Sequence, residues 1–129
     1  MSMINPAAAY RNQQIMMASP EQLTLMLYDG AIRFLRASIT AIDAKDIEKA
    51  HDMNMRTQDI VREFRNTLNM DIELSANWDQ LYEFMEYRLV EGNMKQDKAM
   101  LQEVLDLLKE MRDTWAEAMK LAKGIPAEK

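Results

Sequence analysis

Apolar side chains recur at spacings of three and four residues along most of this chain. These spacings place the side chains on one face of an α-helix. No run of β-branched residues with alternating polarity is present, so we predict no sheet and an all-α fold. The pattern is clearest in a segment that starts at Asp97 and carries Leu101, Val104, Leu105, Leu108, Met111, Trp115, Met119 and Ala122.

Polar residues mark where the predicted helices begin. A helix over 19–42 is expected to start with a capping box between Ser19 and Gln22. Asp46 is suited to cap the second helix, and Ser75 or Asn77 the third, because their side-chain oxygens accept bonds from the first free amides.

Glycines mark where the later helices are expected to end. Gly92-Asn93 should end the third helix and Gly124 the fourth, because glycine and asparagine adopt the left-handed conformation that stops helices. Four helices with short connectors most simply form an antiparallel up-down four-helix bundle, here preceded by a short N-terminal helical segment. We therefore predict a leader over 1–18, a bundle over 19–124 and a tail over 125–129.

Composition excludes several classes of function. The chain of 129 residues has no cysteine, which rules out thiolate catalysis, zinc-thiolate sites and iron–sulfur clusters. Its net charge of −5 gives no basic face for nucleic acid. We see no signal peptide and no apolar run long enough to span a membrane, so we expect no membrane insertion and a cytoplasmic location.

The predicted helix over 19–42 is apolar over well over half of its circumference, which is more than one packing seam requires. One cluster lies around Leu27, and a second is centred about 110° away, at 100° per residue, and includes Tyr28. Gly30 is unusual because a glycine inside a helix lowers the stability of the helix by about 1 kcal/mol relative to alanine. Beside Ala31 it can form a shallow trough for another helix, either within the bundle or from a partner.

Other apolar residues suggest that the partner surface continues. On the third helix, Phe84, Tyr87 and Val90 point away from the predicted core line. With the wide face of the first long helix, they suggest an apolar groove for a partner helix.

The chemical alternatives have little support in the sequence. Glu48 and His51 have the Glu-x-x-His spacing of di-iron bundles, but the chain has only one histidine. Histidine–methionine ligation of a haem is also formally possible. We find no converging catalytic groups and predict no enzyme, no metal site and no cofactor. A metal- or haem-carrying bundle and a structural dimerising bundle remain alternatives to a binding protein.

Three stretches of the sequence resemble the FliS family of flagellar secretion chaperones. They are "NPAAAYRNQQIMMASPEQLTLMLYDGAIRFL" (5–35), "LYEFMEYRLVEGN" (81–93) and "EVLDLLKEMRDTW" (103–115), in the order and spacing of the family. The resemblance implies an antiparallel helical bundle that binds the disordered C-terminal region of flagellin. It also implies that the protein prevents premature polymerisation of flagellin and presents it to the flagellar export gate, without catalysis or cofactor.

The resemblance also implies roles for matched residues. The family links a tyrosine that matches Tyr10 to client binding and to docking at the export gate. We expect the leader to cover part of the client groove as a short lid until the client displaces it. The residues predicted to contact a partner are Tyr10, Ile15, Met16, Met26, Leu27, Tyr28, Gly30, Ala31, Phe34, Tyr87 and Val90.

Overall fold

A computed structural model describes residues 17–67 and 73–122 of the chain. This part of the chain contains four long helices and no strand, which confirms the predicted all-α bundle. The leader up to residue 16, the stop at Gly124 and the tail over 125–129 lie outside the described residues. The helices are α2 (Pro20–Asp43), α3 (Ile47–Asn66), α4 (Glu73–Lys95) and α5 (Lys98–Ala122).

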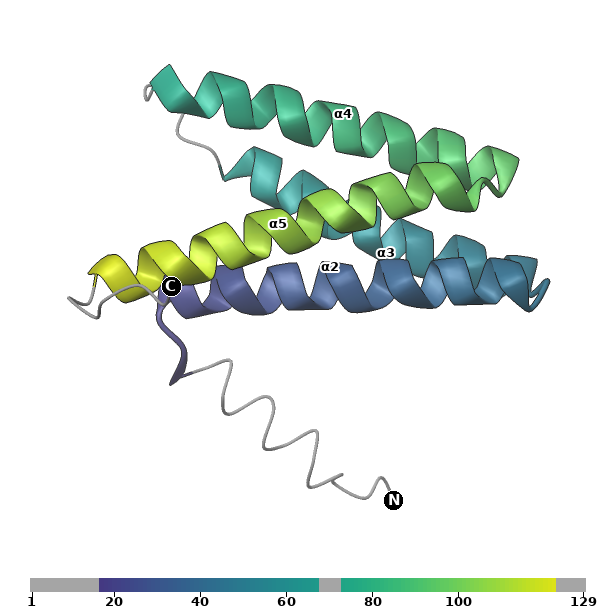
Figure 1. Cartoon of the computed structure of the whole chain (residues 1–129), viewed down its shortest axis with the longest axis horizontal. Helices are drawn as coiled ribbons and strands as arrows, with labels where there is room; N and C mark the ends of the chain where they lie inside the picture. Colours follow the sequence, from purple (N-terminus) through teal and green to yellow (C-terminus); the bar gives the residue numbers. More distant parts are fainter. Residues whose placement is uncertain (1–16, 68–72, 123–129) are drawn as a thin grey trace, which may run out of the picture.

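The four helices run alternately in opposite directions (Figure 1). Helices α2 and α4 each pack against both α3 and α5, so α2 and α4 occupy opposite corners of the bundle (Figure 1). Each helix directs an apolar face inward. The largest fully buried apolar side chains are Leu35, Val61, Met85, Leu89, Leu101, Val104 and Leu108.

Three of the predicted helix starts are confirmed. Ser19 and Gln22 form the reciprocal capping box, with N–O distances of 2.9 and 3.2 Å. Asp46 Oδ1 accepts a hydrogen bond from the Lys49 amide, and Asp97 Oδ1 accepts one from the Met100 amide. These bonds satisfy amides that have no partner within the helix.

The predicted caps of the third helix are wrong. Helix α4 already begins at Glu73, so Ser75 and Asn77 both lie inside it. Glutamate and leucine are good helix formers, and Glu73 and Leu74 extend the helix upstream of the expected start.

The predicted end of the third helix at Gly92 is also wrong. Helix α4 continues to Lys95, and Gln96 adopts the left-handed conformation, with φ of 51°. The Gln96 amide donates to the Asn93 carbonyl and the Asp97 amide to the Gly92 carbonyl, which is a Schellman motif. Gly92 is therefore a buried position inside α4 rather than a stop signal.

The connector between α2 and α3 has the same construction. Lys45 has a φ of 59°, its amide donates to the Ile42 carbonyl, and the Asp46 amide donates to the Ala41 carbonyl. Each connector therefore joins a Schellman motif directly to an aspartate that caps the next helix. Both tight connectors lie at the same end of the bundle (Figure 1).

Candidate partner-binding surfaces

An apolar groove of about 690 Å³ lies between α2 and α3. Gly30 is buried at this groove. A methyl group built there would lie 3.6 Å from Ile60 Cδ1 and 3.9 Å from Arg33 Nη2, which are ordinary van der Waals separations. Glycine is therefore not needed for close packing at this position, and its missing side chain leaves room for a methyl group in the wall of the groove. We call this surface the α2–α3 groove; it is lined by Leu23, Met26, Leu27, Asp29, Gly30, Arg33, Phe34 and Ile60.

The groove brings together four of the residues predicted to contact a partner, namely Met26, Leu27, Gly30 and Phe34. All four come from α2, and Leu27 is 36% exposed. Helix α3 contributes Ile60, a partly buried side chain that also packs against the core. Tyr10, Ile15 and Met16 lie outside the described residues.

Two other predicted contact residues lie beneath the surface. Tyr28 is 3% exposed and Ala31 is 0% exposed, so the fold offers a partner no surface at either. The hydroxyl groups of Tyr28 and Tyr82 lie 2.9 Å apart and form a buried hydrogen bond between α2 and α4. Burial raises the pKa of both phenols, and the Phe64 ring packs against both rings. These residues support the bundle from its core.

Tyr87 and Val90 lie on the outward face of α4. Their exposed fractions are 64% and 42%, and Phe84 and Met94 are exposed on the same helix. Because α2 and α4 are at opposite corners of the bundle (Figure 1), these residues cannot line one groove with Leu27 and Gly30. The hypothesis of a single groove shared by the first and third long helices is therefore wrong.

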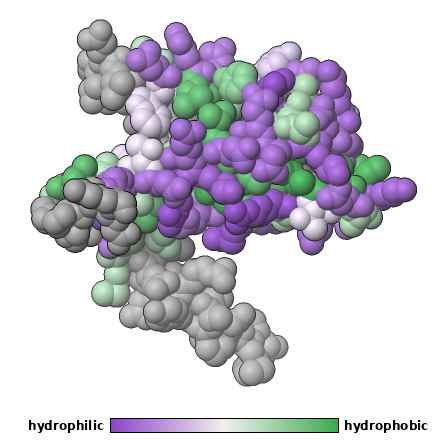
Figure 2. Space-filling view, viewed as in Figure 1, coloured by the Kyte–Doolittle hydropathy of each residue, from purple (hydrophilic) through white to green (hydrophobic). Residues whose placement is uncertain are grey.

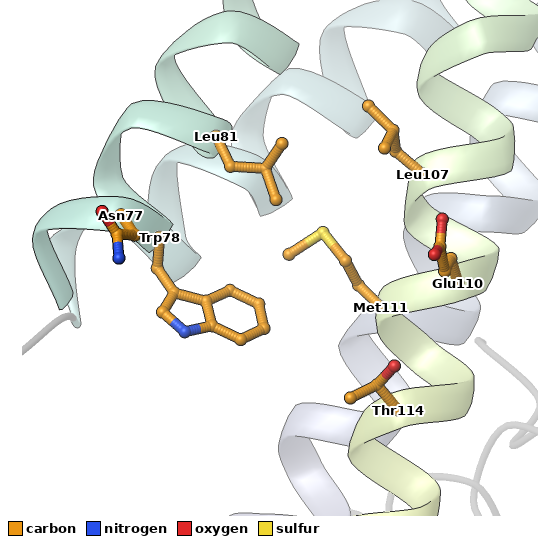
Figure 3. Close-up of a pocket in the computed structure, with 7 residues that line it drawn as sticks. All are labelled: Asn77, Trp78, Leu81, Leu107, Glu110, Met111 and Thr114. Carbon is orange, nitrogen blue, oxygen red and sulfur yellow. The ribbon is translucent and has the colours of Figure 1, made fainter. Parts of the chain in front are cut away.

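A second apolar depression, of about 280 Å³, lies between α4 and α5. Trp78 and Leu81 from α4 point toward Met111 and Leu107 from α5 (Figure 3). The apolar spacing did not predict this α4–α5 pocket, because periodicity does not show which helix faces lie opposite each other. A space-filling view shows hydrophobic side chains on the upper half of a largely hydrophilic face (Figure 2).

Polar side chains connect the helices around these surfaces. Arg112 Nε donates to Asp29 Oδ1 at 2.8 Å, which ties α5 to α2 and raises the pKa of Arg112. His51 Nδ1 lies 2.8 Å from Asn93 Nδ2 and links α3 to α4.

Within residues 17–67 and 73–122, no group of three or more His, Asp or Glu residues is placed to hold a metal ion. No helix in these ranges is long and apolar enough to cross a membrane.

The geometry defines a class of protein: a helical bundle with exposed apolar surfaces suited to segments of another protein. The family model described as "Flagellar protein FliS" matches residues 3–122. The chain therefore belongs to the FliS family of flagellar secretion chaperones.

Individual relatives agree with this assignment. The flagellar secretion chaperone FliS of Bacillus subtilis (strain 168) is 39% identical over 120 residues, which cover 93% of this chain and 90% of the relative. The Escherichia coli (strain K12) protein of the same name is 32% identical over 108 residues, covering 81% and 79% of the two chains. A structure described as "Crystal structure of flagellar chaperone from bacteria" matches with a TM-score of 0.72. It covers 89% of this chain and 98% of its own, and at 16% identity this match supports the fold alone.

Proposed function

We propose that this protein binds the disordered C-terminal segment of flagellin in the cytoplasm. Binding would prevent premature polymerisation of flagellin and allow the complex to present it to the cytosolic domain of the flagellar export gate. The observation that carries this proposal is the α2–α3 groove, whose apolar walls remain open at Gly30. In a member of a flagellar secretion chaperone family, an unfilled groove of this kind suits an amphipathic helix of the client.

The mechanism requires only binding, with no enzymatic step and no cofactor. A free flagellin segment has apolar positions that would associate with other copies, and these positions are covered once they lie in the groove. Ordering the client opposes binding, so we expect a long contact made of several weak parts. We include Tyr87 and Val90 as contacts of a client that continues round the bundle, and residues 1–18 as a lid that the client displaces.

The groove can be tested by filling it. Gly30→Leu places a larger side chain at the open position, and we expect about tenfold weaker binding of a flagellin C-terminal peptide, equivalent to about 1.4 kcal/mol. Isothermal titration calorimetry gives the affinity, and circular dichroism confirms that the variant remains helical. Ala99→Leu also creates a leucine, at an exposed position of α5 away from the described surfaces, and adds one carbon fewer than Gly30→Leu, so it serves as the control.

Unchanged affinity in a folded Gly30→Leu protein would refute this use of the groove. Light scattering after size-exclusion chromatography separates the broader alternatives. A chaperone should form a one-to-one complex with the peptide, whereas a purely structural dimer should keep its mass when peptide is added. Metal analysis and a visible absorption spectrum of the purified protein test the metal- or haem-carrying alternative.

A further inference from the structure

One charged residue that lines the α2–α3 groove forms no ion pair with any described residue. Two charged side chains, Asp29 and Arg33, line the groove. Asp29 is paired with Arg112 at 2.8 Å, and the same guanidinium also pairs with Asp113 at 3.2 Å. Arg33 is exposed and forms no ion pair or hydrogen bond with any described residue. Arg33 is therefore the charged residue of the lining that forms no ion pair within the described part of the chain, in a protein with a net charge of −5.

The position of Arg33 directs this charge toward the occupant of the groove. Its Nη2 atom lies 3.9 Å from the point where a side chain at Gly30 would begin. The guanidinium thus lies next to the open part of the groove, where the client is proposed to bind. A second guanidinium, that of Arg56 on α3, lies over the Phe34 ring at 5.7 Å from its centre. Arg56 also pairs with Asp52 at 3.3 Å, but both side chains are more than half exposed, so this pair is weak.

We propose that Arg33, assisted by Arg56, selects a client helix whose apolar stripe is flanked by aspartate or glutamate. The apolar walls favour any amphipathic helix of suitable size, whereas the guanidinium groups favour one with carboxylates beside its apolar side chains. Arg33 is thus a specificity residue for the groove. This inference rests on the proposed function, because it concerns the same groove and the same client.

The test uses two probes and two charge reversals in the full-length protein. One probe is the C-terminal segment of flagellin, and the other is the same peptide with each Asp and Glu replaced by Asn and Gln. The variant is Arg33→Glu. The control is Arg36→Glu, which makes the same change at an exposed residue of α2 that does not line the groove and has no ion pair with any described residue.

We expect Arg33→Glu to weaken binding of the acidic peptide about threefold to tenfold at low salt, and less at high salt. Arg36→Glu should have a clearly smaller effect. The amide peptide should bind wild type more weakly than the acidic peptide does, and it should not distinguish wild type from Arg33→Glu. This pattern would assign the effect to carboxylates that meet Arg33.

Equal affinities of wild type and Arg33→Glu for the acidic peptide would overturn the specificity role and leave the proposed function intact. Equal losses of affinity in Arg33→Glu and Arg36→Glu would also overturn it, because the effect would then reflect the overall charge of the protein rather than a contact at Arg33. Failure of wild type to bind either peptide would overturn both this inference and the proposed function.

Discussion

Gly30 and Gly92 both lie buried within long helices, yet they have opposite effects on their surroundings. A methyl group at Gly30 would meet its neighbours at 3.6 Å or more, whereas one at Gly92 would lie 2.8 Å from Leu101 Cδ2 and 3.3 Å from Met100 Cβ. Gly92 therefore permits close packing of α4 against α5, and Gly30 leaves an open groove between α2 and α3. The same residue type can serve packing at one seam and binding at another.

The largest effect is expected when both glycines are changed to the same residue. Gly92→Leu should lower the free energy of unfolding by about 3 kcal/mol or more, because the new side chain overlaps the fully buried Leu101. Gly30→Leu should remain folded and lose client affinity instead. Chemical denaturation of both variants measures the difference. Equal free energies of unfolding for the two variants would contradict the conclusion that only Gly92 is needed for close packing.

A smaller effect is expected at the hydrogen bond that joins the helices of the two glycines. Tyr82→Phe leaves the buried Tyr28 hydroxyl without its partner and should destabilise the protein by about 1–2 kcal/mol. The double variant Tyr28→Phe/Tyr82→Phe removes both hydroxyl groups and should be closer to wild type than the single variant is. Thermal unfolding followed by circular dichroism measures both. A double variant less stable than the single one would show that the hydrogen bond is not the cause.

The smallest expected effect is an increase in the stability of the protein. Gly30→Ala adds only a methyl group, which the structure accommodates, and it should stabilise the protein by about 0.5–1 kcal/mol because alanine favours helix over glycine. Differential scanning calorimetry should show a higher melting temperature. A lower one would mean that this seam is as tightly packed as the one at Gly92.

Local signals in the sequence predicted much of the fold. The helix starts at Ser19, Asp46 and Asp97 depend on hydrogen bonds between residues only three apart in the sequence. These starts can therefore be predicted without knowledge of the tertiary structure. The two helix ends were harder to predict. Lys45 and Gln96 occupy left-handed positions that usually hold glycine, so no glycine marks either helix end in the sequence.

The candidate site was predicted only in part, because periodicity identifies a face of a helix but not what packs against it. Met26, Leu27, Gly30 and Phe34 were found and meet in one groove. Tyr28 has equal apolar character but turns into the core. Arg33 was not among the predicted contact residues, because only the structure shows its guanidinium 3.9 Å from the position of a side chain at Gly30. The role of all these residues in client binding remains a prediction.

The two tight connectors also have a consequence for how the chain folds. Each one closes a hairpin of two helices that are adjacent in sequence, α2 with α3 and α4 with α5, so the loop-closure entropy of each hairpin is small. The remaining seams, between α2 and α5 and between α3 and α4, join the two hairpins to each other. We therefore expect the hairpins to form early and rapidly and to dock afterwards, as in other helical folds dominated by contacts of short sequence separation.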